Sequence, residues 1–225
     1  MGAIIGEFLP FAIGIAISPL PIIVVNLTLL GARARTSSVG FLLGWVVGIL
    51  AVIVILTAVS TVLPERADSA PSIWSGILKL VLGALLLLLA VKQWHKRPHA
   101  GETPEVPGWM KKVDSLGFGG GVRLGLFLSV VNPKNVILST SVGVDLGTSD
   151  LPFGALAVAT GVFAVIAAST VLIPVIAYAI AARRLHAPLE SLHTWLTREN
   201  HTIMGVLFVV LGSVTLGKGI GIIWP

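Results

Sequence analysis

Apolar residues fill six long stretches of the chain, and each stretch is separated from the next by a shorter polar or proline-rich link. A helix needs about 20 mostly apolar residues to cross a bilayer, and every stretch reaches that length. The pattern therefore predicts six membrane-spanning helices. They cover residues 2–30, 38–63, 72–92, 118–147, 151–181 and 202–223.

The amino-acid composition points to the same class of protein. Of the 225 residues, 55% are hydrophobic and 11% are charged, and the mean hydropathy is +0.98. A soluble domain carries about 25% charged residues. We therefore predict an all-α, multi-pass membrane protein.

Lysine and arginine gather in alternate links. Eleven of the 15 lie in or beside the links after the first, third and fifth stretches: Arg33, Arg35, Lys92, Lys96, Arg97, Lys111, Lys112, Arg123, Arg183, Arg184 and Arg198. The opposite links hold one arginine and the acids Glu65, Asp68, Asp145 and Asp150. By the positive-inside rule the basic links are cytoplasmic, so both termini lie outside the plasma (inner) membrane. This orientation accounts for the basic residues, and no nucleic-acid partner is expected.

Prolines interrupt the first and fourth stretches. Pro19 and Pro21 lie in "SPLP", and Pro133 lies in "NPKN". Proline lacks a backbone N–H and crowds the preceding turn, so a helix breaks there. In hydrocarbon the freed backbone groups are tolerated only inside protein or along a wet cavity. We expect helices 1 and 4 to be broken near mid-membrane.

The two halves of the chain correspond weakly at an offset of 114 residues. The matched positions are Gly6 with Gly120, Pro19 with Pro133, and Gly40 with Gly154. Because three spans are an odd number, the second copy enters the membrane from the opposite side. This predicts two inverted three-helix repeats, an arrangement common in secondary transporters. The repeats would cover residues 1–92 and 118–225, joined by a cytoplasmic linker over 93–117. Chance alignment of glycines in apolar helices is the alternative.

The second break carries a lysine. Lys134 lies midway through the fourth stretch, where a lysine costs about 2.5–3.5 kcal/mol on insertion scales and is usually functional. We expect it to neutralise an anionic substrate, with hydrogen bonds from neighbouring polar side chains. The candidate substrate-binding residues are Ser18, Asn26, Asn132, Lys134 and Asn135. The alternatives are that Lys134 reaches an interface, that the segment is re-entrant and ends there, and that Asn26 only links helices.

No pattern of catalytic or metal-binding residues stands out. The chain has no cysteine, its histidines lack H-x-x-x-H spacing, and nucleotide-binding and nucleophile motifs are absent. We expect no enzyme, no cofactor and no metal site, and energy from an ion gradient or a partner. Gly40, Gly44 and Gly48 form a stripe of small residues that predicts close helix contacts, either internal or in a homodimer.

Three segments resemble a known family. "SPLPIIVVNLTLLGARARTSSVGFLLGW", "GILKLVLGALLLLLA" and "NPKN" are similar to the LysE superfamily of small membrane exporters. The chain looks most like its actinobacterial GAP/Sap-like, glycolipid-addressing branch. Amino-acid exporters of the superfamily usually carry Gly-Pro where this chain has Ser18-Pro19. The resemblance implies a role in moving or addressing cell-envelope glycolipids.

These observations favour a transporter that moves a lipid-linked or amphipathic anion across the plasma membrane, with membrane lipids as its surroundings. One alternative is an exporter of amino acids or other small solutes that uses the same site. Another is an accessory subunit that associates with a larger envelope-lipid transporter.

Overall fold

The structure is a computed structural model of the chain. It describes residues 2–62, 73–96, 113, 115–149 and 151–224. The predicted linker over 93–117 therefore lies largely outside the described residues.

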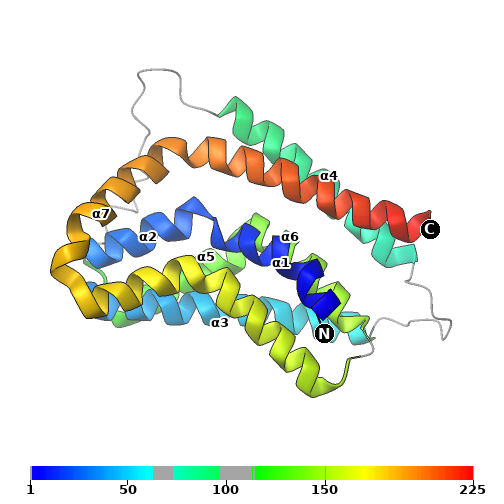
Figure 1. Ribbon diagram of the computed structural model, residues 1–225, viewed down its shortest axis with the longest axis horizontal. Coiled ribbons are helices and arrows are strands. Elements are labelled where there is room, and N and C mark those ends of the chain that lie inside the picture. The colour runs from blue at the N-terminus through cyan, green and yellow to red at the C-terminus, as the bar shows by residue number, and fades with distance from the viewer. Residues whose placement is uncertain (1, 63–72, 97–112, 114, 150, 225) are drawn as a thin grey trace.

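The described part of the chain is helical and contains no strand (Figure 1). Its helices are α1 (Gly2–Ala16), α2 (Pro19–Leu30), α3 (Ala34–Val62), α4 (Ile73–His95), α5 (Phe118–Val131), α6 (Pro133–Gly147) and α7 (Phe153–Ile223).

Four helical segments are long and apolar enough to cross a membrane: Ala34–Ser60, Ile73–His95, Phe153–Ala182 and Ala187–Ile223. The pair α1 and α2, bent by 50° at its break, makes a fifth if it is one span. The described residues thus form an all-helical, multi-pass membrane protein with four or five candidate spans. A sixth span through α5 and α6 stays a prediction, because α5 alone has only 14 residues. α6 in turn carries a buried polar face. This face includes Lys134, Asn135, Ser139 and Ser141.

The polar link predicted between residues 181 and 202 is part of a helix. α7 kinks at Ala181, where φ is −139° and ψ is 45°, and then continues to Ile223. Leu189 and Leu196, seven residues apart, are both buried, and Leu196 packs with Ile22 and Ile23 of α2. This apolar stripe holds the link against the bundle in helical form.

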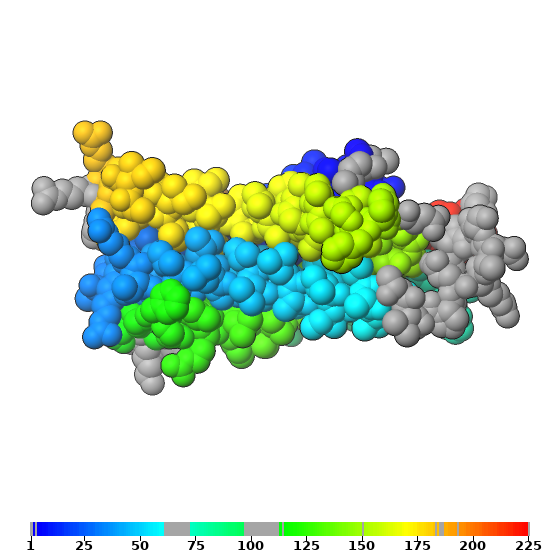
Figure 2. Space-filling view, turned by 90° about the horizontal axis from the view of Figure 1, so that it is seen from below, coloured from blue at the N-terminus to red at the C-terminus, as the bar shows by residue number. Residues whose placement is uncertain are grey.

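Glycines let α3 and α5 run side by side in the same direction. A Cβ atom added to Gly44 would lie 2.1 Å from the carbonyl oxygen of Val122, and one on Gly125 would lie 2.2 Å from that of Phe41. Small residues permit such backbone contact between membrane helices. The predicted stripe that includes Gly44 is therefore an internal helix contact. Figure 2 shows α3 between α5 and the N-terminal part of α7.

A second glycine contact joins α4 to the C-terminal part of α7. A Cβ atom added to Gly83 would lie 3.0 Å from the carbonyl oxygen of Gly212. One added to Gly219 would lie 3.0 Å from that of Gly76. The two glycine pairs run in opposite order, so these helices are antiparallel, as Figure 1 shows.

Both termini lie at the same end of the bundle, at the right of Figure 1. The α2–α3 connection, which carries Arg33, and the kink of α7, which Arg184 follows, lie at the other end. Which end faces the cytoplasm stays the prediction of the positive-inside rule.

Candidate functional site

The break between α1 and α2 frees two backbone carbonyls. Pro19 has no N–H to offer Ile15, and the N–H of Ser18 donates to the Ile15 oxygen at 3.2 Å instead of continuing the helical pattern. Ser18 is extended, with φ −66° and ψ 116°. The carbonyls of Gly14 and Ala16 therefore lose their helical donors, as expected at a proline break.

Side chains from two other helices satisfy these carbonyls. The Lys134 Nζ of α6 donates to the Gly14 oxygen at 2.8 Å. The Thr170 Oγ1 of α7 donates to the Ala16 oxygen at 2.5 Å. Lys134 is only 1% exposed, so it is neither at an interface nor in solvent. Its ammonium joins the first break to the second, 120 residues away in sequence.

The second break is capped by its own asparagine. α5 ends at Val131 and α6 begins at Pro133, with Asn132 extended between them (φ −70°, ψ 111°). The Asn132 side-chain oxygen accepts from the backbone N–H of Lys134 at 3.0 Å. An N-terminal half-helix end carries partial positive charge, so the Lys134 ammonium adds to a positive region. We call Gly14, Ser18, Asn132, Lys134 and Asn135 the break site.

Three polar side chains that lie in α2 and α6 or cap them are buried without hydrogen-bond partners among the described residues. The Ser18 hydroxyl and the Asn26 and Asn135 amides have no hydrogen-bond partner among the described residues, although each residue is at most 1% exposed. An unsatisfied buried polar group costs about 1–3 kcal/mol. The break site therefore combines a buried cation with spare hydrogen-bonding capacity, which suits an anionic ligand.

The structure does not bring all five predicted site residues to one point. Ser18, Asn132, Lys134 and Asn135 flank the two breaks. Asn26 lies eight residues along α2 from Ser18, which is about 12 Å of helix. Asn26 is therefore outside the break itself.

Removing the Thr170 hydroxyl is expected to weaken the first break. Thr170→Val leaves the Ala16 carbonyl unsatisfied, so the free energy of unfolding should fall by about 1–2 kcal/mol. Thermal unfolding in detergent measures this change. Thr140→Val is the matched control, because the Thr140 hydroxyl only adds a second bond to the Val136 carbonyl within α6. Equal melting of the two variants would contradict the role of Thr170.

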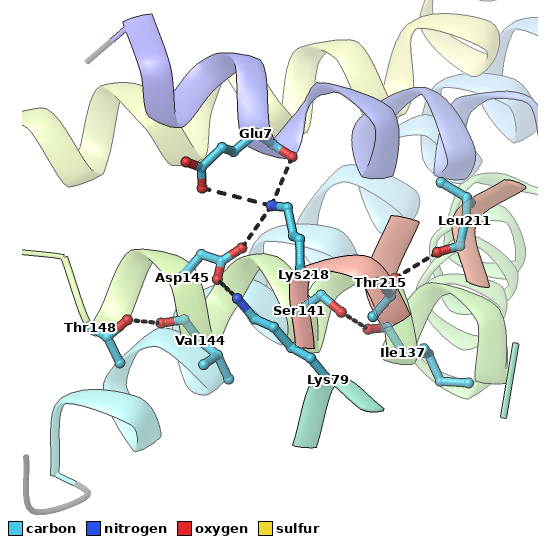
Figure 3. A network of polar contacts seen from close by, with 10 residues as sticks. All are labelled: Glu7, Lys79, Ile137, Ser141, Val144, Asp145, Thr148, Leu211, Thr215 and Lys218. Carbon is cyan, nitrogen blue, oxygen red and sulfur yellow. Dashed lines mark hydrogen bonds and ion pairs between the residues drawn. The ribbon is translucent and has the colours of Figure 1, made fainter. Parts of the chain in front are cut away.

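A second polar cluster lies at the end of the bundle that holds both termini. We call it the four-charge cluster: Glu7 of α1, Lys79 of α4, Asp145 of α6 and Lys218 of α7 (Figure 3). Lys79 pairs with Asp145 Oδ1. The Lys218 Nζ lies 3.3 Å from Asp145 Oδ2 and 3.7 Å from Glu7 Oε2.

Sequence reasoning assigned Asp145 to an external link and missed its role as the centre of this cluster. The Asp145 side chain is 16% exposed and that of Lys79 is 7% exposed. A signal was present, because a lysine inside an apolar stretch needs a partner. Asp145 also falls within the predicted span over 118–147.

The four-charge cluster borders a pocket and stands apart from the break site. The pocket holds about 60 Å³ and is lined by Ile4, Glu7, Phe8, Val142, Asp145, Leu146 and Ser149. Asp145 follows Lys134 by 11 residues on α6, which is about 16 Å of helix. Within the described residues, no three acidic or histidine side chains are grouped to hold a metal ion.

Comparisons with known proteins agree with the glycolipid-addressing branch that the sequence resembles. The family model described as "Sap, sulfolipid-1-addressing protein" matches residues 8–221. The peptidoglycolipid exporter Gap of Mycolicibacterium smegmatis (strain ATCC 700084 / mc(2)155) is 34% identical over 102 residues, which cover 45% of this chain and 37% of that exporter. No solved structure matches. The wider LysE superfamily stays a prediction. Because the family match covers nearly the whole chain, the protein belongs to the Sap, sulfolipid-1-addressing protein, family.

Proposed function

We propose that this protein moves an anionic glycolipid across the plasma membrane and binds its charged group at the break site. Membership of a family named for addressing a sulfolipid supports the substrate class, as does similarity to a peptidoglycolipid exporter. The observation that carries the proposal is the fully buried Lys134 ammonium, which joins the two helix breaks.

The binding step exchanges one partner of Lys134 for another. In the conformation described here the ammonium is held by the neutral Gly14 carbonyl. A sulfate, phosphate or carboxylate group would add the attraction between two full charges, which the neutral carbonyl does not provide. The anion is further favoured by the N-terminal ends of α2 and α6. Asn132, Asn135 and Ser18 supply hydrogen bonds, and Asn26 supplies a polar contact farther along α2.

Conformational change in this proposal comes from two inverted repeats of three spans, with the breaks near mid-membrane. The packing supports such symmetry. The broken pair α1 and α2 packs on α7, the broken pair α5 and α6 packs on α3, and α4 packs on the C-terminal part of α7. Rocking along the glycine contacts opens the break site to one side and then to the other. The basic links are cytoplasmic, both termini are outside, and an ion gradient or a partner supplies energy.

A lipid-flipping assay tests the proposal. The purified full chain is placed in liposomes with a fluorescent sulfated galactosylceramide or with the uncharged galactosylceramide of the same chain length. Dithionite then quenches only the probe in the outer leaflet. We expect the protein to speed flipping of the sulfated probe by about 1,000-fold over protein-free vesicles and over the uncharged probe, because Lys134 selects for negative charge.

Three outcomes would overturn the proposal. Equal flipping of both lipids would remove the anion selectivity. Efflux of amino acids from loaded vesicles without lipid flipping would favour a small-solute exporter. No flipping, combined with loss of surface glycolipid from cells lacking the protein, would favour an accessory subunit.

A further inference from the structure

We propose that the four-charge cluster is a second anion site on the route of the substrate, kept shut by Asp145. In this inference, which rests on the proposed function, the charged group of the lipid displaces the Asp145 carboxylate from Lys79 and Lys218. Asp145 thus acts as an internal stand-in for the anion.

The arrangement around Asp145 is one that a bound anion would have. Its two carboxylate oxygens are shared between two ammonium groups: Oδ1 pairs with Lys79 and Oδ2 lies 3.3 Å from Lys218 (Figure 3). Sulfate and phosphate groups also present several negatively charged oxygens that two ammonium groups can share. Two lysines from different helices that converge on one carboxylate therefore form a ready anion site once that carboxylate leaves.

The surroundings allow the exchange. Lys218 already has other partners, because it donates to the Glu7 carbonyl at 3.3 Å and lies 5.1 Å from the centre of the Phe11 ring. The pocket of about 60 Å³ lies beside Asp145 and provides space for its displaced side chain. The cluster has two acids and two lysines, so an incoming anion is balanced only if Asp145 moves away.

The cluster also has a position that suits a second station. α6 carries Lys134 near its first residue and Asp145 near its last. The four charges come from α1, α4, α6 and α7, so their ion pairs tie together helices from both halves of the chain. Breaking these pairs frees this end of the bundle to open.

The absence of cysteine from the chain provides a direct test of opening. Ser141 lies one helical turn from Asp145 and is 1% exposed. Ser141→Cys therefore reports whether reagent passes the cluster. In lipid nanodiscs, where both faces are accessible, a membrane-impermeant maleimide should label this cysteine slowly. Adding Asp145→Asn should raise the labelling rate by about tenfold, because the bridge between Lys79 and Lys218 is lost and the open population grows. Thr148→Cys, at an exposed position, is the control that labels rapidly in both backgrounds.

Protection by an anion tests the binding site itself. In the Asp145→Asn background, glucose 6-sulfate should slow labelling of the Ser141→Cys reporter by about threefold at constant ionic strength, because bound ligand stabilises the occupied state. Glucose should have no effect. The double change Lys79→Gln with Asp145→Asn restores the charge balance and guards against misfolding. It should stay monodisperse, label fast and lose the protection.

The outcomes separate this inference from the proposed function. An unchanged labelling rate after Asp145→Asn in a folded protein would show that Asp145 does not keep the cluster closed. Faster labelling without protection by the sulfated sugar would show that the cluster binds no anion and that its ion pairs only hold the helices together. Neither result affects lipid flipping through Lys134. Failure of the flipping assay with protection intact would reject glycolipid transport and keep the anion site.

Discussion

Replacing Lys134 by methionine is expected to lower the flipping rate of the sulfated lipid by about 100-fold, which equals about 2.8 kcal/mol. This value lies within the range for a hydrogen bond to a charged group, about 1.5–3 kcal/mol. The dithionite assay measures it directly. The uncharged lipid should be flipped at the same slow rate by both proteins, because it gains nothing from the ammonium.

The Lys134→Met variant should still fold. Methionine keeps the length of the side chain, and removing a buried charge together with its desolvation cost is often neutral. The loss of one donor to Gly14 should cost about 1–3 kcal/mol of unfolding free energy at most. A monodisperse elution profile and a melting curve would show that the defect lies in transport.

Two further variants sharpen the interpretation of the Lys134 result. Lys134→Arg keeps the positive charge and should retain flipping within about tenfold of the original rate, with some loss from altered geometry. Lys92→Gln removes an exposed lysine near the end of α4 and should change nothing. Rapid flipping by Lys134→Met would show that the buried ammonium only holds the helices together.

Replacing Gly44 by valine is expected to prevent assembly of the bundle. An added Cβ atom would lie 2.1 Å from the Val122 oxygen and 2.9 Å from the Leu126 nitrogen. Both atoms belong to the backbone, so no side chain can rotate away. Separating α3 from α5 would then displace the second break. Overpacking usually costs about 1–3 kcal/mol and occasionally more, and we expect the upper end here.

The measurement for Gly44→Val is the fraction of detergent-extracted protein that elutes as a single monodisperse species. We expect about a tenth of the original yield or less, as for a severely destabilised protein. Gly161→Val is the matched control, because an added Cβ atom at Gly161 meets nothing within 4 Å. Similar yields for the two variants would show that α3 and α5 can separate without loss of the fold.

Local backbone chemistry explains which features could be predicted from the sequence. Proline acts on its own turn, so Pro19 and Pro133 indicate where α2 and α6 begin. The burial of Lys134 also agrees with the apolar stretch around it. The all-helical membrane class follows from composition alone.

Contacts between distant segments explain the rest. The partner of Lys134 is a carbonyl 120 residues earlier, and those of Asp145 lie 66 and 73 residues away. No pattern within a single helix encodes such pairs. The polar residues between 181 and 202 predicted a link between spans. In the structure this link is helical, with Leu189 buried in the main core and Leu196 packed against α2. Whether a polar segment folds onto a bundle depends on the surface that it meets.

The continuity of α7 has a mechanical consequence. Its first arm is tied to α1 through Thr170 and the Ala16 carbonyl, and its second arm is tied to α6 through Lys218 and Asp145. The chain is helical on both sides of the kink at Ala181. A rotation of one arm is therefore passed to the other, whereas a flexible loop would not pass it on. Tilting the first arm therefore strains the ion pair between Lys218 and Asp145 on the second arm. A flexible insert at the kink would uncouple the two arms and leave the break site and the four-charge cluster unchanged.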